Sequence, residues 1–279
     1  MRKTLKELLK ESGEFNKEEL KFLPRSFDVI GNIALIQIPK QLEKKKKIIG
    51  NALLGLNKNV KAVYCKGKHY GKLRKQQIEL IAGLPLEETI CKESGCIFKL
   101  NVKTCFFSPR LATDRLEIAK QVKQGEKILV MFSGVAPYAI VIAKNAKPKE
   151  VTCIELGKEA CKYAEENVKI NKLNNIKIIQ GDVKKVARKL AKLKKRFDRI
   201  VMPRPQLKYD FLQEAFLLAK KGTIIHFHDF VLEKDIEKVK AKIERAAKKA
   251  KRSVKILRIK KVREIAPYKL NIRVDFMLV

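Results

Sequence analysis

The feature that most constrains the fold is a regular alternation of short apolar runs and helical patterns after Ser108. The runs typical of strands lie at 127–132, 151–155, 176–180, 197–202, 222–228, 253–260 and 271–279. Helical patterns separate the first six, whereas a turn containing Pro267 leads to the last. This alternation predicts a doubly wound α/β sheet, mostly parallel, with helices on both faces.

The residues before this alternation have a different pattern. Apolar alternation, helical spacing and further strand-like runs between 21 and 107 predict a small mixed α/β unit. Leu5, Leu8 and Leu9 have helical spacing, so residues 1–20 are interpreted as a short helix or a loose leader. We therefore expect three parts, at 1–20, 21–107 and 108–279.

The charge balance indicates a polyanionic partner. The chain carries 64 Lys and Arg residues against 30 Asp and Glu residues, a formal net charge of +34 spread along its length. Neutralised phosphates give affinity for nucleic acid without any particular fold. The alternative is a lysine-rich surface that only faces solvent.

Cysteine usage and hydropathy favour a cytoplasmic protein. The six cysteines form no C-x-x-C pair, and no signal peptide precedes them, so we expect reduced thiols. The most membrane-like run, 128–143, is short and contains Gly134 and Pro137. A strand, a turn and a helix explain it better than a membrane span.

Three strand ends indicate a nucleoside cofactor. The first strand ends in FSGVAPY, residues 132–138, where Gly134 permits close backbone approach and Pro137 suits a first helical turn. Glu155 closes the second strand at the spacing of an acid that binds ribose hydroxyls, and Asp182 follows the third strand beside an expected adenine edge. The alternatives are a surface acid for Glu155 and a helix N-cap for Asp182. A nicotinamide cofactor would favour a fuller G-x-G-x-x-G, which is absent.

Several segments over residues 22–279 resemble one family. They are LPRSFDVIGNIALI, LRKQQIELIAGLPLEETICKESGCIF, FSPRLATDR, MFSGVAP and APYKLNIRVDF. In order and spacing the chain resembles the archaeal and eukaryotic tRNA (guanine-37, N1) methyltransferases, which use S-adenosylmethionine. The resemblance implies a class I methyltransferase fold with an antiparallel last strand. It also implies that 22–107 form the RNA-facing domain, with a further N-terminal module reduced to about 20 residues.

The resemblance also implies catalytic roles. The family segment S-P-R-L-x-x-E-R falls on 108–115, where the glutamate thought to take the guanine N1 proton is Asp114. Methylation at N1 needs such a base and a cation near the carbonyl oxygen. Arg74 matches the arginine given that second role, and Arg110 and Arg115 would hold phosphate or keep Asp114 ionised. An alternative for Asp114 is a structural cap and ion pair at a helix start.

Other positions follow from the same family pattern. Phe106 matches an aromatic residue that can stack on the nucleotide, although a Phe beside Phe107 is also typical of a core. The expected cofactor contacts come from the turn and from strand ends: Phe132, Ser133, Gly134, Val135, Pro137, Glu155, Asp182 and Pro205.

This chain departs from the family at three places. Val130 replaces an acid on the first strand, and Ala136 replaces a glycine. The third place is the MPRP stretch after the fourth strand, where Pro203 replaces an asparagine that helps to hold the target base. The two prolines lack backbone N–H donors, and they stiffen the chain where it leaves the fourth strand. We expect Arg204, or the carbonyl of Met202, to take over part of the role.

Two histidines alternate on the fifth predicted strand. His226 and His228 have strand spacing but no further convergent ligands, which favours packing or rim positions over a metal site. We expect no metal.

Three functions remain open from the sequence. The first is methylation of N1 of guanosine 37, or of a wyosine-precursor purine, next to the anticodon of tRNA. The second is transfer of the aminocarboxypropyl group, since the wybutosine-pathway relatives also lack the asparagine. The third is a paralogue that binds tRNA without catalysis, which Val130, Ala136 and Pro203 together motivate. We expect a monomer that does not associate with membranes.

Overall fold

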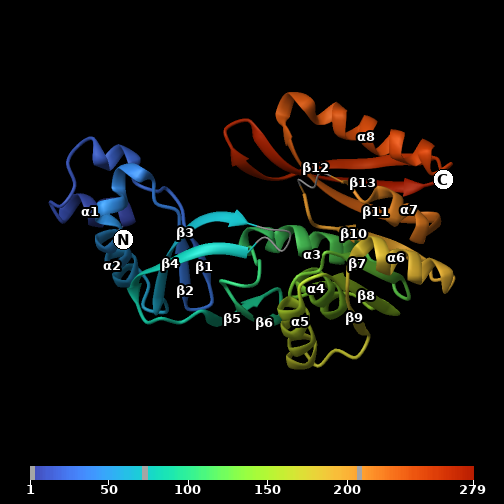
Figure 1. The fold of residues 1–279 in the computed structure, drawn as a ribbon, viewed down its shortest axis with the longest axis horizontal. Coiled ribbons are helices and arrows are strands. Elements are labelled where there is room, and N and C mark those ends of the chain that lie inside the picture. The colour runs from blue at the N-terminus through green and yellow to red at the C-terminus, as the bar shows by residue number, and fades with distance from the viewer. Residues whose placement is uncertain (1–3, 71–74, 206–208) are drawn as a thin grey trace. The chain divides into compact units, whose positions relative to one another are not determined.

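The computed structural model describes residues 4–70, 75–205 and 209–279, and Arg74 lies outside these ranges. The described chain divides into two compact units (Figure 1). The first contains Met1–Glu93 and Ile97–Pro109, and the second contains Ser94–Cys96 and Arg110–Val279.

The first unit is a small mixed α/β structure. Its helices are α1 (Leu5–Glu11), α2 (Lys46–Leu56) and two 3₁₀ helices at Glu19–Phe22 and Lys40–Lys45. Its four-stranded sheet has the order β1 (Asp28–Ile30), β2 (Ile33–Ile36), β3 (Ala62–Tyr70) and β4 (Lys75–Gly83). A separate two-stranded sheet consists of β5 (Glu88–Glu93) and β6 (Cys96–Asn101).

The N-terminal segment is a helix that belongs to this unit. Thr4 caps α1, and Glu7 completes a reciprocal capping box with it. Leu5 and Leu9 are buried in the same apolar cluster as Leu53 of α2. The alternative of a loose leader is therefore wrong for α1.

The second unit is the doubly wound sheet that the sequence predicts. Its strands are β7 (Lys127–Met131), β8 (Glu150–Glu155), β9 (Ile176–Gln180), β10 (Phe197–Met202), β11 (Ala219–Leu232), β12 (Val254–Ala266) and β13 (Lys269–Leu278). Its helices are α3 (Ala112–Gln121), α4 (Pro137–Asn145), α5 (Lys158–Ile170), α6 (Val183–Lys192), α7 (Leu212–Leu218) and α8 (Ile236–Lys249). Two 3₁₀ helices lie at Pro109–Leu111 and Glu233–Asp235.

The strand order is β12-β13-β11-β10-β7-β8-β9, and β13 runs antiparallel to both of its neighbours. The expectation of an antiparallel last strand is confirmed. β11 and β12 are longer than predicted, because their pairing with β13 continues to the turn at Tyr268, which has a positive φ of 59°.

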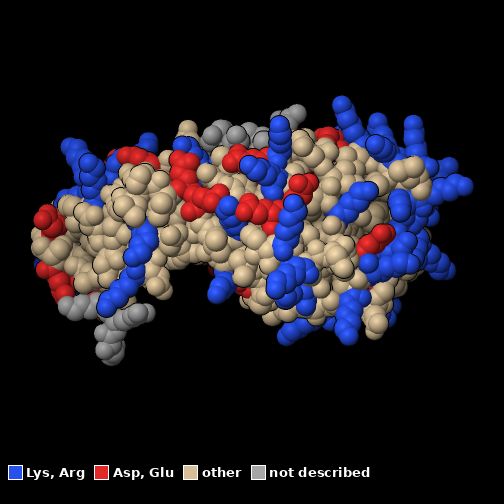
Figure 2. Space-filling model, turned by 90° about the horizontal axis from the view of Figure 1, so that it is seen from below, with Lys and Arg blue, Asp and Glu red and all other residues tan. Residues whose placement is uncertain are grey.

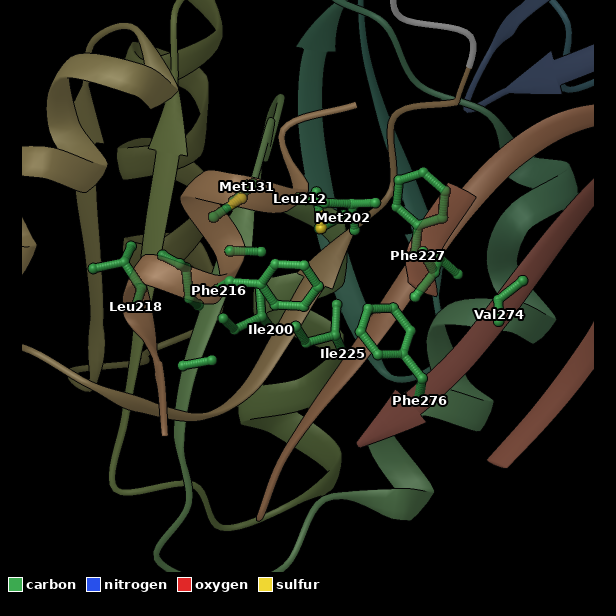
Figure 3. Close-up of a cluster of buried hydrophobic side chains, with 14 of the residues drawn as sticks. Met131, Ile200, Met202, Leu212, Phe216, Leu218, Ile225, Phe227, Val274 and Phe276 are labelled. Carbon is green, nitrogen blue, oxygen red and sulfur yellow. The ribbon is translucent and has the colours of Figure 1, made fainter. Parts of the chain in front are cut away.

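One face of this sheet is apolar, as the close-up in Figure 3 shows. Side chains from β10, β11 and β13 form a buried cluster with α6, α7 and α8, including Ile200, Phe227 and Phe276. Neighbouring residues in a strand point to opposite faces. The residues that alternate with this cluster therefore face α3 and α4, and several of them are charged.

Two general properties follow from the described residues. None of the six cysteines forms a disulfide within the described residues. No helix in the described ranges is long and apolar enough to cross a membrane.

Candidate active site

The turn after β7 has an unusual backbone. Phe132, Gly134 and Ala136 all have positive φ, of 58°, 56° and 64°. The Ser133 N–H donates to the carbonyl of Ile154 on β8, at 3.1 Å. Ala136 in this conformation costs about 1 kcal/mol relative to glycine, the residue that the family pattern has there. Pro137 then begins α4, so the tight turn delivers the chain directly into a helix.

Glu155 joins the ends of two strands. Its Oε2 accepts a hydrogen bond from the Gly134 N–H and its Oε1 accepts one from the Gly157 N–H, each at 2.8 Å. Each carboxylate oxygen has a second lone pair that can accept from a hydroxyl. This carboxylate therefore fits the ribose of a nucleoside cofactor at the carboxyl ends of β7 and β8.

Asp182 begins α6 as its N-cap. Its Oδ1 accepts from the Lys184 N–H at 2.9 Å, so the N-cap interpretation describes what the side chain does in this structure. Its predicted contact with an adenine edge stays a prediction.

Three aromatic rings contact one another in a row close to the turn after β7. The ring of Phe132 meets that of Phe211 edge-on at 4.9 Å between centroids, and Phe211 meets Tyr209 in the same way at 4.9 Å. Lys184 Nζ lies 3.5 Å from the Tyr209 centroid, and the Arg204 guanidinium lies 5.5 Å from that of Phe132. The sequence reasoning missed Phe211 and Tyr209, although the YDF that follows MPRP contains both.

The MPRP exit lies beside this group. Pro203 and Arg204 are half-buried and Pro205 is buried. Burial lowers the pKa of Arg204, while the negative charge of Glu155 acts in the opposite direction. Arg204 is thus close enough to the Glu155 carboxylate and to Phe132 to belong to one site with them.

Asp114 lies on α3, against the polar face of the sheet, and is only 2% exposed. Its Oδ2 accepts from the Tyr138 hydroxyl at 2.7 Å and contacts His228 Nε2 at 2.9 Å, and Arg273 Nη1 pairs with its Oδ1. Burial alone would raise the pKa of Asp114, but His228, Arg273 and Tyr138 together lower it well below the ordinary range. The carboxylate is therefore ionised and strongly held.

A buried polar network continues from Arg273 across the sheet. Arg273 Nε and Nη2 donate to the two oxygens of Asp275 at 2.8 and 3.0 Å, and Asp275 Oδ1 contacts His226 Nδ1 at 2.6 Å. His226 Nε2 meets Arg199 Nη1 at 2.8 Å, and Arg199 pairs with Glu126 at 2.7 Å. Both histidines are therefore buried in this network, and the alternative of a rim position is wrong for them.

The remaining predicted residues differ in how far they are buried. Arg115 is buried, with its guanidinium 5.7 Å from the Tyr138 ring centroid. Arg110 is exposed. Ser133 and Val135 are buried in the turn after β7. Phe106 belongs to the first unit, where it is half-buried.

Positive charge is concentrated where helices of the second unit end. Figure 2 shows Lys and Arg crowding the right-hand end of the face that it draws, the end at which α6 ends in Figure 1. The last turns of α6 and α8 carry Lys189, Lys192, Lys248 and Lys249. The helix macrodipole stabilises cations at these ends, so part of the charge has a structural reason.

Comparison with known proteins identifies the family. The model of the TRM5/TYW2 methyltransferase domain matches residues 89–257, and that of the TYW2 N-terminal domain matches residues 5–86. The chain is 40% identical to "tRNA (guanine(37)-N(1))-methyltransferase Trm5b" of Pyrococcus abyssi, covering 93% of this chain and 77% of that protein. It is 36% identical to "tRNA (guanine(37)-N(1))/4-demethylwyosine(37)-methyltransferase Taw22" of Nanoarchaeum equitans, covering 91% of this chain and all of that protein.

A solved structure supports the same family assignment. "The complex structure of aTrm5 and tRNALeu" superposes with a TM-score of 0.85 at 27% identity, covering all of this chain and 79% of that one. The chain belongs to the TRM5/TYW2 methyltransferase family.

Proposed function

We propose that this protein transfers a methyl group from S-adenosylmethionine to N1 of guanosine 37 in tRNA, next to the anticodon. The main support is the Glu155 carboxylate, which accepts hydrogen bonds from the backbone just after β7 and just after β8. The chain is also 40% identical to a relative named for this reaction. The relative named for both guanosine 37 and 4-demethylwyosine supports a wyosine precursor as a second substrate.

The residues of the turn and of the strand ends fit the cofactor. Glu155 accepts the ribose hydroxyls, Asp182 lies at the start of α6 for the adenine edge, and Phe132 and Phe211 supply apolar ring faces. The bound cofactor supplies a methyl group on a positively charged sulfur. Ser133, Val135, Pro137 and Pro205 complete the proposed cofactor contacts.

The reaction also requires an acceptor for the guanine N1 proton and a group that stabilises the negative charge developing on the carbonyl oxygen. Guanine N1 carries a proton that has to leave as the methyl group arrives, so a base is needed within hydrogen-bond reach. In this proposal the acceptor belongs to the cluster around Asp114, and Arg74 stabilises the carbonyl oxygen. Arg110 and Phe106 contact the RNA, whereas the buried Arg115 helps to keep Asp114 ionised.

Arg204 takes over part of the role of the asparagine that Pro203 replaces. Its half-buried guanidinium next to Phe132 supports this assignment. Arg204→Ala should weaken turnover or tRNA affinity, measured by single-turnover kinetics and filter binding. If turnover and tRNA affinity both stay unchanged, Arg204 has no such role and the MPRP stretch only stiffens the chain after β10.

The test of the reaction is the product itself. Incubation of tRNA with the donor, digestion and mass spectrometry should show a methylated purine at position 37. An aminocarboxypropyl product at that position would instead support the second candidate. The TYW2 N-terminal domain match over residues 5–86 and Pro203 favour that candidate.

Binding measurements separate the third candidate. No calorimetric signal with S-adenosylmethionine, together with salt-dependent tRNA binding, would support a non-catalytic paralogue. We place the enzyme in the cytoplasm with its tRNA, as a monomer.

A further inference from the structure

His228 has one engaged ring nitrogen and one without a partner. Nε2 contacts Asp114 Oδ2 at 2.9 Å, whereas Nδ1 is buried and makes no hydrogen bond to any described residue. The residue is 2% exposed, and its ring meets that of Tyr138 edge-on at 5.9 Å between centroids. A buried polar atom left unpaired destabilises the folded state, so such an atom calls for an explanation.

The surroundings determine which nitrogen carries the proton. Asp114 is ionised and can only accept, so the short contact requires a proton on Nε2 of His228. Nδ1 of the neutral imidazole then has a lone pair. A carboxylate that fixes the tautomer of a histidine and leaves its far nitrogen as a base is an arrangement used in general-base catalysis.

Asp114 itself is poorly suited to take the proton directly. Its oxygens already accept from Arg273, Tyr138 and His228. The same donors that lower its pKa make it a weak base toward guanine N1. The lone pair on Nδ1 of His228 receives no donor from any described residue.

His228 also lies at the proposed position of the target base. Phe227 pairs with Met202, so the next residue on β11 is level with Pro203 at the exit of β10. In the proposed function, this exit faces the base that is methylated.

Resting on the proposed function, we propose that His228 Nδ1 accepts the N1 proton of the target guanine and that Asp114 is the positioning residue behind it. The N1–H bond breaks and an Nδ1–H bond forms. The bond from N1 to the methyl carbon forms as the bond from that carbon to the donor sulfur breaks. The products are the methylated base, the neutral thioether and an imidazolium that passes its proton to water.

Charged or titratable groups lie around His228 on α3, α4 and β13 and on β11 itself. Asp114 and Arg115 come from α3, Tyr138 from α4 and Arg273 from β13, and His226 precedes it on β11. The negative charge of Asp114 stabilises the positive charge that the imidazole gains, whereas the positive charges of Arg273 and Arg115 disfavour it. The pairing of Arg273 with both Asp114 and Asp275 offsets part of that repulsion.

The test compares two histidine variants from the same network. In His228→Gln the base is lost, so the single-turnover rate at saturating tRNA and donor should fall by about 10²–10⁴-fold. His226→Gln is the matched control, because both nitrogens of His226 already have partners and it has no role in the proton transfer. It should retain the rate within a few-fold.

The pH profile gives a second kinetic readout. The wild-type rate should fall as the pH is lowered, because a proton on Nδ1 removes the base, and this pH dependence should be absent from the residual rate of His228→Gln. The KM values for tRNA and donor should change little, because the proton transfer belongs to the chemical step. A rate for His228→Gln within a few-fold of wild type would contradict the proposal and indicate that Asp114 is the base.

A measurement without turnover keeps the proposal falsifiable if His228→Gln fails to fold. Nitrogen-15 NMR of histidine-labelled wild-type protein should show His228 protonated on Nε2 and bare on Nδ1 at neutral pH. In Asp114→Asn the side-chain amide can donate, so the proton should move to Nδ1. An Nδ1-protonated His228 in the wild type would overturn the proposal. If the wild-type product contains no methylated purine, the proposed function fails, whatever the tautomer is.

Discussion

Removal of the Arg273 side chain should strongly destabilise the second unit. The residue is fully buried and binds Asp275 through Nε and Nη2, Asp114 through Nη1, and Glu117 at 3.3 Å. In Arg273→Met the buried carboxylates remain without the cation that offsets their desolvation. Breaking one partner out of a buried ion pair costs about 3–5 kcal/mol.

The expected change in melting temperature follows from that free energy. A domain of this size loses about 2–4 °C per kcal/mol, so Arg273→Met should melt about 6–20 °C below wild type. The assay is thermal unfolding followed by circular dichroism, with urea unfolding to give the free energy. The loss should be smaller near pH 4–5 than at pH 7. In the variant burial raises the pKa of the carboxyls, so protonation removes the unpaired charge as the pH falls.

Arg258→Met provides the matched control. Arg258 pairs with the same carboxylate of Glu117 at 2.7 Å, but its side chain is 56% exposed. Exposed ion pairs contribute about 0–1 kcal/mol. If Arg273→Met and Arg258→Met lose the same stability, the buried network does not stabilise the fold and the reasoning is wrong.

Three further predictions concern the turn, the cofactor and acid stability. Ala136→Gly should raise the free energy of unfolding by up to about 1 kcal/mol in urea, because glycine adopts positive φ without strain. Glu155→Ala should weaken S-adenosylmethionine binding in calorimetry, with a loss of at least about 1–3 kcal/mol for the hydrogen bonds left unmade. Burial lowers the pKa of His226 and outweighs the opposite effect of Asp275, and the charges of Arg199 and Arg273 add to the lowering, so the folded state resists its protonation. Stability should therefore fall as the pH drops below about 6.5, where the unfolded histidine protonates, and His226→Gln should flatten that fall in urea titrations at pH 5 and 7.5.

The layout of the second unit was predictable because its sequence signals are local. Each strand and helix carries its own periodicity, and the alternation alone implies a doubly wound sheet. The ends of β11 and β12 were not predictable, because they extend by pairing with β13 along a ribbon that the apolar pattern does not mark.

The polar network was missed although its signal is present in the strands. In NIRVDF the residues Arg273 and Asp275 alternate with apolar neighbours, as His226 and His228 do in IIHFHDF. In a sheet covered by helices on both faces, a charged residue at such a position has no route to water, so it must be paired inside. That rule predicts burial but not partners, because pairing depends on the register of β11 against β13 and on where α3 places Asp114. The register aligns His226 with Asp275 and His228 with Arg273, and this alignment makes the Asp114–His228 contact possible. Single-strand patterns therefore identify the candidates for such a network, and only the three-dimensional register selects the pair that can transfer a proton.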